Sequence, residues 1–361
     1  MPQHRGAWAD SPEANASGKV SHGTYFEAVH AFLSSNGFEN VLTSASTIMG
    51  KPLNLKDINT IEIILEKHGE YYHPSRIEAD VQGQRLAMVL NVAFSTKGRA
   101  CLQREYGVLQ KLMTAYTWPF LPRVYAAGEV QLPGLGNVSM FLGQWFRGFH
   151  EFHLTRHPDA SHNQLIVWDP NKGPVYLSDA QVESIYEQAA EILTAYFNLE
   201  TYEQIFAWHH AAGDFVVNTE QEQPQVKLIT ARQYAPLFEQ VENDAEALMQ
   251  ALFLFLLNLS IRMRLDRLDG VGAVGWAPDV AVPATVKGFF LGLARQLAAL
   301  DVPQKAAQNF RNYLKMHSKN DILDGLAAVS DRYDSAMPGL SVVKGHLPAH
   351  AASLWAVLEH L

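Results

Sequence analysis

The feature that most constrains the fold is a change in the spacing of apolar residues along the chain. Between residues 58 and 95 the sequence has strand character, in the runs INTIEIILEK, YYHPSRIEADV and QRLAMVLNVAFS, which short turn segments separate. From about Ser178 onward the apolar residues recur mainly at helical spacing, as in SDAQVESIYEQAAEILTAYFNL. This order predicts an α+β protein: a small antiparallel β lobe with one helix, followed by a larger, mainly helical lobe.

The length of the chain favours two lobes, because 361 residues are many for a single hydrophobic core. We expect a flexible tail over residues 1–23, a β-rich N-lobe with a leading helix over residues 24–146, and a mainly helical C-lobe over residues 147–361. The run TYFEAVHAFLSSNGF predicts the leading helix, with a stop at Gly37.

Charge and cysteine content exclude several classes of protein. The formal net charge of −9 argues against nucleic acid or an anionic membrane as the main partner, although a small phosphorylated ligand remains compatible with it. The single cysteine, Cys101, excludes disulfides within the chain and favours a reducing, cytoplasmic location. The apolar run over residues 247–261 is too short to span a bilayer and predicts a buried helix.

Two polar residues lie on faces that are otherwise apolar or small. Asn91 is the polar exception on the face of its strand that carries Ala87, Val89 and Ala93. In the following helix, STKGRACLQREYGVLQKLM, Glu105 falls on the same stripe as the leucines. Either a cation or several donors satisfy this carboxylate, or it lies at the edge of the stripe and reaches water.

The stretch WHHAAGDFVV, residues 208–217, places two histidines before a small-residue turn, one aspartate and a short strand. A histidine can act as a general base near neutral pH, and an aspartate can hold a divalent cation. The same residues can also serve only to hold a tight turn, with Asp214 capping backbone amides.

A zinc site is another interpretation of the histidines. The run FHEFH supplies His150, Glu151 and His153, which could join His209, His210 and Asp214. Histidines three residues apart share a face of a helix but not of a strand, and this run continues a strand pattern. A zinc site is therefore disfavoured.

Several local sequences together resemble the protein-kinase-like fold, in its aminoglycoside/choline phosphotransferase branch, between about Ile61 and Leu300. The run VLNVAFS is similar to the third strand, where the family carries a phosphate-gripping lysine, and REYGVLQKL to the helix whose glutamate holds that lysine. The run FLGQWFRG, which contains Gln144, resembles the strand and hinge that receive adenine. The run WHHAAGDFVV is similar to the catalytic loop, and VKLITARQY to the strand with the metal-binding aspartate.

The departures from this family pattern fall on its charged residues. Asn91 stands at the lysine position, whereas Glu105 remains at the glutamate position. With Gly213-Asp214 placed over the family's Gly-Asn, His209 falls at the catalytic aspartate and Asp214 at the metal-binding asparagine. Thr230 falls at the second metal-binding aspartate. Phosphoryl transfer depends on charge neutralisation by Mg²⁺ and a lysine, so these losses predict poor catalysis.

The resemblance therefore implies a degenerate, pseudokinase-like phosphotransferase, whose cleft between the lobes binds a nucleotide or small ligand without efficient transfer. It implies ATP and Mg²⁺ as weak or absent cofactors, with nucleotide contacts from Asn91, Glu105 and Gln144 and metal contacts from Asp214 and Thr230. The alternative is an active ATP-dependent small-molecule kinase in which His209 is the base and Asp214 holds the metal. Lys67 would then reach Glu105 and the phosphates in place of the missing lysine.

Overall fold

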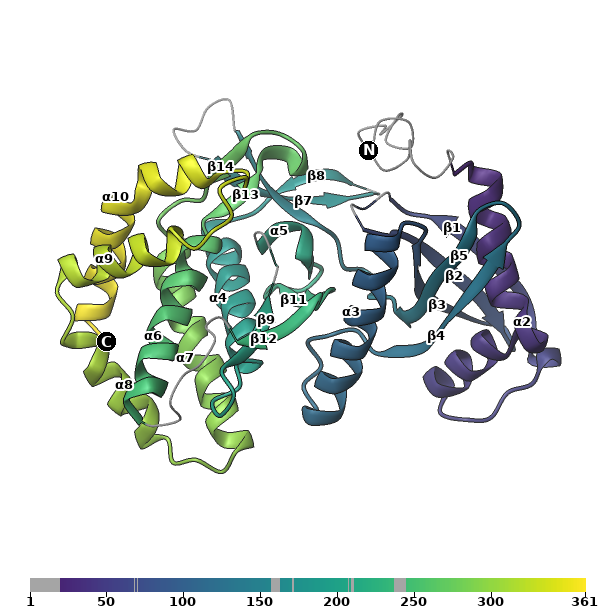
Figure 1. Ribbon diagram of the computed structural model, residues 1–361, viewed down its shortest axis with the longest axis horizontal. Helices are drawn as coiled ribbons and strands as arrows, with labels where there is room; N and C mark the ends of the chain where they lie inside the picture. The colour runs from purple at the N-terminus through teal and green to yellow at the C-terminus, as the bar shows by residue number, and fades with distance from the viewer. Residues whose placement is uncertain are drawn as a thin grey trace. The chain divides into compact units, whose positions relative to one another are not determined.

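The computed structural model describes residues 20–67, 69, 71–156, 163–170, 172–206, 208, 211–236 and 245–361. It divides the chain into two compact units, Met1–Arg147 and Gly148–Leu361. The protein mixes helices with antiparallel sheets, as the sequence predicts for an α+β protein (Figure 1). The predicted division between residues 146 and 147 differs by one residue from the boundary between the two units.

The first unit is a five-stranded antiparallel sheet with two long helices. The sheet order is β1-β2-β3-β5-β4, and α3 connects β3 to β4. The elements of this unit are α2 (His22–Met49), η1 (Leu55–Asp57), β1 (Ile58–Leu65), β2 (His73–Val81), β3 (Gln84–Ala93), α3 (Thr96–Ala115), β4 (Val124–Leu132) and β5 (Gly136–Gln144).

The leading helix differs from its prediction at both ends. Its first residue is His22, where the Ser21 hydroxyl accepts a hydrogen bond from the Thr24 amide, so that helical structure begins within the predicted tail. The backbone leaves the helical conformation over residues 35–38, where Gly37 has φ 69°, and the helix then resumes as far as Met49. The predicted stop at Gly37 is therefore a break inside α2.

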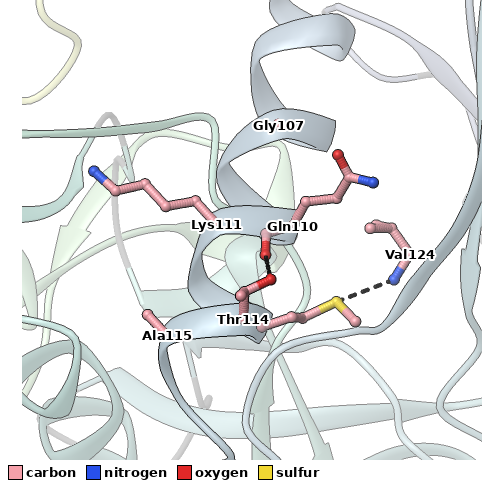
Figure 2. A pocket seen from close by; sticks show the side chains of 7 residues that line it. Gly107, Gln110, Lys111, Thr114, Ala115 and Val124 are labelled. Carbon is pink, nitrogen blue, oxygen red and sulfur yellow. Dashed lines mark hydrogen bonds between the residues drawn. The ribbon is translucent and has the colours of Figure 1, made fainter.

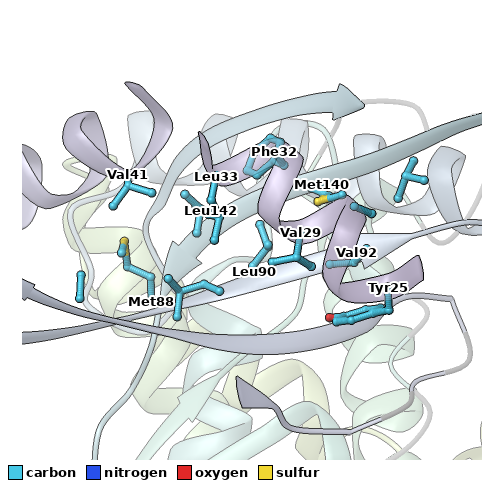
Figure 3. Packing of buried hydrophobic residues seen from close by; sticks show 14 of the residues in the cluster. Tyr25, Val29, Phe32, Leu33, Val41, Met88, Leu90, Val92, Met140 and Leu142 are labelled. Atoms are coloured by element: carbon cyan, nitrogen blue, oxygen red, sulfur yellow. The ribbon is translucent and has the colours of Figure 1, made fainter. Parts of the chain in front are cut away.

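Alternation along the strands gives the sheet two different faces. Leu86, Met88, Leu90 and Val92 of β3 pack against α2 in one apolar core (Figure 3). The opposite face, which carries Asn91, lies on the side of α3, where the rings of Tyr106 on α3 and Phe141 on β5 are 5.7 Å apart. Asn91 therefore points away from the core that α2 covers.

The second unit is mainly helical but holds more strands than the sequence predicts. The strands expected in WHHAAGDFVV and VKLITARQY pair as a hairpin, with Phe215 opposite Leu228, whereas three further small sheets were not predicted. The elements are β6 (Phe152–Arg156), β7 (Asn163–Asp169), β8 (Gly173–Tyr176), α4 (Asp179–Ala195), β9 (Glu203–Phe206), α5 (Ala211–Asp214), β10 (Phe215–Asn218), β11 (Gln225–Leu228), β12 (Gln233–Pro236), α6 (Ala245–Arg262), β13 (Leu265–Arg267), η2 (Leu268–Gly270), β14 (Val274–Trp276), α7 (Ala281–Ala299), α8 (Lys305–Lys315), α9 (Lys319–Ser330) and α10 (Leu340–Glu359).

Two glycines let α7 lie directly against α4. A Cβ atom added to Gly288 would lie 2.0 Å from the Glu187 carbonyl oxygen, and one added to Gly292 would lie 2.5 Å from the Glu191 carbonyl oxygen. The obstacle is backbone in both cases, so a side chain at either position forces the two helices apart.

Helix α6 is the only helix in the described part of the chain that is long and apolar enough to cross a membrane. The protein buries 67% of it, and its buried residues include Leu256, Leu257 and Ile261. The apolar residues of α6 therefore pack within the second unit.

Candidate functional site

The hairpin β10–β11 brings Asp214 and the segment around Thr230 side by side. Asp214 is the residue before β10, and Thr230 follows the end of β11 by two residues. The Asp214 carbonyl oxygen accepts a hydrogen bond from the Ile229 amide at 2.9 Å. Both side chains are buried, with 5% of each residue exposed. Asp214 and Thr230, which the resemblance assigns to one metal site, thus lie side by side at the open end of the same hairpin.

Asp214 has a partner that the sequence pattern did not identify. Arg232 Nη2 donates a hydrogen bond to Asp214 Oδ1 at 2.8 Å, and 7% of the Asp214 side chain and 20% of the Arg232 side chain are exposed. Arg232 follows Thr230 by only two residues, so the run TARQ contained a signal for a cation at this site. The pair neutralises the one carboxylate expected in the metal pocket.

The histidine run FHEFH lies next to the same hairpin, but it does not gather into a metal centre. The backbone of His150 pairs with that of Val217, with N–O distances of 2.8 and 2.9 Å. Within the residues that the structure describes, no group of three or more His, Cys, Asp or Glu side chains is arranged to hold a metal ion. His209 and His210 lie outside the described residues.

His153 is instead held between two carboxylates. Its Nδ1 atom lies 3.4 Å from Asp266 Oδ1, and its Nε2 atom lies 3.8 Å from Glu151 Oε2. Burial lowers the pKa of His153, but hydrogen bonds and charges from Asp266 and Glu151 outweigh it and raise the pKa to about 9. Asp266 also accepts the Leu154 amide at 2.6 Å. His153 is therefore an imidazolium that ties β6 to β13.

Trp208, the residue before the two histidines, is anchored by α6. Only 2% of Trp208 is exposed, and its carbonyl oxygen accepts a hydrogen bond from Arg262 Nη1 at 2.7 Å. The Arg262 guanidinium also lies 4.7 Å from the centre of the Tyr333 ring. Helix α6 thus holds Trp208, the residue that precedes the expected catalytic loop.

In the first unit, the side chain of Asn91 is nearly buried and has no hydrogen bond within the described chain. It lies on β3 between Pro74 of β2 and Phe141 of β5, and 9% of it is exposed. None of the described residues accepts from its amide or donates to it. The amide is not among the fully buried polar atoms that lack a partner, so it still reaches the surface. This amide faces the side of the sheet opposite the α2 core.

Glu105 is buried, which excludes the alternative that it reaches water at the edge of the helix. Only 1% of Glu105 is exposed, and its Oε2 atom accepts a hydrogen bond from the Tyr72 hydroxyl at 2.6 Å. A neutral phenol thus contacts the carboxylate for which the resemblance implies a lysine. Tyr72 lies 33 residues earlier in the chain, in the turn before β2.

Replacing Tyr72 with phenylalanine is expected to destabilise the first unit by about 2 kcal/mol, because a buried carboxylate loses a hydrogen bond. Chemical denaturation of Tyr72→Phe against the wild type measures this loss. The Tyr106→Phe variant is the control, since the Tyr106 hydroxyl only accepts an exposed hydrogen bond from Gln110. Equal stability of the two variants would contradict this role for Tyr72.

The remaining predicted nucleotide contacts lie at the ends of strands. Lys67 is exposed, two residues after β1. Gln144 ends β5, and its backbone amide already donates to the Arg123 carbonyl oxygen at 2.7 Å. Its side chain accepts the Arg123 amide at 3.3 Å. Gln144 is therefore engaged with β4, and the next residue, Trp145, directs its backbone N–H towards β3, where Met88 lies opposite Gln144.

A network of charged side chains, which the sequence analysis did not predict, occupies the same sheet face as Asn91. Glu78, with 7% exposed, contacts both Arg76 and Arg85. Arg76 also binds Glu66 at 2.6 Å, and Arg85 binds Glu62 at 2.7 Å. Strand alternation could have revealed it, because Arg76 lies opposite Val89, two residues from Asn91. We call these five residues the sheet ion-pair network.

The structure also shows a groove of about 750 Å³ on the first unit (Figure 2). The Met113 sulfur accepts a hydrogen bond from the Val124 amide at 3.3 Å, and Figure 2 draws this bond as a dashed line that ends at Val124. None of the predicted site residues lines it. The lining residues are Gly107, Gln110, Lys111, Met113, Thr114 and Ala115 of α3 and Val124 of β4.

Comparison with known proteins adds no further assignment. No protein-family model matches the chain, and no curated protein is detectably similar to it. The interpretation of the site therefore rests on the geometry of its residues.

Proposed function

We propose that this protein is a degenerate, pseudokinase-like phosphotransferase that binds a nucleotide or another small ligand and transfers phosphoryl groups poorly. The fold we propose is protein-kinase-like, in the aminoglycoside/choline phosphotransferase branch. The sheet order β1-β2-β3-β5-β4, the helix α3 after β3 and the hairpin β10–β11 support it. The single cysteine supports a cytoplasmic location, and the negative net charge argues against nucleic acid as a partner.

The observation that carries the binding function is the side chain of Asn91. Only 9% of Asn91 is exposed, and its side-chain amide makes no hydrogen bond within the described chain. A ligand that donates to or accepts from this amide therefore forms hydrogen bonds that the protein leaves unmade. The resemblance places the phosphates of a nucleotide at this position of β3.

Trp145 supplies a second contact of the kind that adenine needs. It directly follows β5, and no described residue donates to its backbone carbonyl oxygen. Backbone groups recognise the edge of a base whatever side chains surround them, so this contact survives the loss of catalytic residues. Both contacts belong to the first unit.

The charges around Asn91 explain why we propose binding without efficient transfer. The sheet ion-pair network contains three carboxylates and two guanidinium groups, so it offers no excess of positive charge to a triphosphate. Asn91 itself is neutral, and the Tyr72 hydroxyl contacts Glu105. Each group that stabilises the transition state of such a reaction contributes about 3 kcal/mol. The absence of several such groups is therefore expected to slow phosphoryl transfer greatly.

The alternative, an active kinase with His209 as base and Asp214 as metal ligand, has less support. Asp214 is already paired with Arg232, and a guanidinium beside a carboxylate opposes the binding of a second cation there. No described contact favours His209 as a base. A turnover assay distinguishes the two candidate functions.

The proposed function predicts ATP binding with very slow turnover. We expect calorimetry to detect ATP binding to the wild type, and the release or transfer of the γ-phosphate to be at least about 1,000-fold slower than the roughly 1–100 s⁻¹ of active kinases. Turnover near 1 s⁻¹ would contradict the proposal in favour of the active enzyme.

A blocking variant tests whether the ligand lies against the sheet. Val89 shares the face of Asn91, and a tryptophan there fills the space beside the amide. We expect Val89→Trp to weaken ATP binding at least about tenfold, equivalent to about 1.4 kcal/mol. The matched control is Leu55→Trp, at an exposed residue of η1. Equal affinity of both variants for ATP would place the ligand elsewhere.

A further inference from the structure

Strand β1 forms one edge of the five-stranded sheet of the first unit, and β2 is its only neighbour within that sheet. Just beyond β1, the Glu66 amide donates a hydrogen bond to the Pro74 carbonyl oxygen at 3.1 Å. In an antiparallel pair, residues that bond to the neighbouring strand alternate with residues that do not. The backbone N–H and C=O groups of Ile61, Ile63 and Leu65 therefore point away from β2, towards the open edge.

The described part of the chain leaves this edge uncovered. Ile61, Ile63 and Leu65 make no backbone hydrogen bond outside the sheet with any described residue, and their side chains pack only partly against the α2 core. Natural edge strands are often protected from pairing by lysine or proline. β1 contains neither, and Glu62 is its only charged residue. Its backbone and its apolar side chains therefore suit pairing with a further strand.

We propose that β1 pairs antiparallel with β1 of a second copy of this protein, about a two-fold axis at Ile63. In this register Ile63 lies opposite Ile63 of the partner subunit, and Ile61 lies opposite Leu65 of the partner subunit. Each of these pairs exchanges backbone hydrogen bonds in both directions, because the outward groups of the two strands are the same. The paired side chains lie on the α2 side of both sheets, so they join the two apolar cores.

Charge selects this register among those that a two-fold axis allows. A register centred on Glu62 would place two Glu62 carboxylates directly opposite each other, which is destabilising. In the proposed register, Glu62 lies opposite Ile64 of the partner subunit. Lys67 of the partner subunit lies opposite Asn59, whose amide donates to the Asp80 carboxylate at 3.2 Å, so a cation approaches a carboxylate. The edge is therefore complementary to itself, as a two-fold interface requires.

Sedimentation equilibrium of the full chain measures the proposed association. One added strand makes an interface below about 1,200 Å², so we expect a reversible monomer–dimer equilibrium with a dissociation constant near about 10 μM. Ile63→Pro removes an N–H group that points outward, and edge strands tolerate proline at such positions. We expect Ile63→Pro to remain folded, as judged by circular dichroism, and to weaken the association at least about tenfold.

A cysteine on the two-fold axis tests the register independently. In Ile63→Cys the two introduced thiols lie opposite each other, with Cα atoms about 5.5 Å apart, within reach of a short bismaleimide. Asn59→Cys is the matched control, because Asn59 is exposed on the same strand and its two copies lie about 26 Å apart in this register. We expect cross-linked dimers from Ile63→Cys, and none from Asn59→Cys or from the wild type, whose Cys101 is buried.

Several outcomes would overturn the proposal. A wild type that stays monomeric at concentrations well above the expected dissociation constant would do so, as would species larger than a dimer, because the axis closes the assembly. A dimer that Ile63→Pro leaves intact, or that cross-links through Asn59→Cys and not through Ile63→Cys, would place the interface elsewhere. If Ile63→Pro does not fold, the cross-linking comparison decides alone. None of these results depends on ATP binding, which tests the proposed function separately.

Discussion

Replacing Gly288 with alanine is expected to lower the free energy of unfolding of the second unit by about 3 kcal/mol or more. The added Cβ atom would lie 2.0 Å from the Glu187 carbonyl oxygen and 2.9 Å from the Ala190 Cβ atom. No rotamer change relieves a contact with backbone, so α7 must move away from α4 along its length. For a unit of this size, such a loss lowers the melting temperature by about 6–12 °C.

Gly345 provides the control for this substitution. It is an exposed glycine of α10, in the same unit, and a Cβ atom there would meet nothing within 4 Å. Gly345→Ala is expected to stabilise the unit by up to about 1 kcal/mol, because alanine favours the helix. Denaturation of both variants, followed by circular dichroism, measures the difference. If Gly288→Ala were as stable as Gly345→Ala, the close packing of α4 and α7 would be wrong.

The second large effect is a pH dependence that originates at His153. Its pKa is about 9 in the folded protein, whereas the ordinary value is 6.5. The folded state therefore holds a proton that the unfolded state releases, and the resulting stabilisation is fully present below pH 6.5. It is lost as the pH rises through 9. The pKa difference corresponds to about 3 kcal/mol.

Unfolding of the wild type and of His153→Gln at several pH values between 6.5 and 9 measures this effect. The wild type should lose stability over this range, and the variant should lose much less. His350, whose pKa burial lowers to about 3, contributes equally to the wild type and to the variant, so its effect cancels in the comparison. His360→Gln, at the exposed end of α10, is the control. If the free energy of unfolding fell equally steeply with pH in the wild type and in His153→Gln, His153 would be excluded as the source of the pH dependence.

Local patterns in the sequence were sufficient to predict the strands of the sheet in the first unit and the two strands that form the hairpin β10–β11 in the second. Leu86, Met88 and Leu90 alternate with smaller residues on the other face, and this alternation is a property of the strand itself. The break in α2 was predicted only as an end, because Gly37 signals a left-handed turn but carries no information on whether the helix resumes beyond it. The extra strands of the second unit are mostly three to five residues long, too short to show a period.

The partners at the site could not be predicted in the same way. Asn91, Glu105 and Asp214 were found because each is polar in an apolar or small-residue setting. Their surroundings depend on folding: Tyr72 is 33 residues from Glu105, and Arg232 is 18 residues from Asp214. The sequence therefore predicts where charge is missing from the family pattern, but not which side chain takes its place.

The most direct test of the proposed binding site is a crystal structure of the full chain grown with ATP. We predict nucleotide density beside the Asn91 amide, on the face of the sheet that also carries Val89. Nucleotide density at another place on the molecule, with none beside Asn91, would contradict this account of the protein.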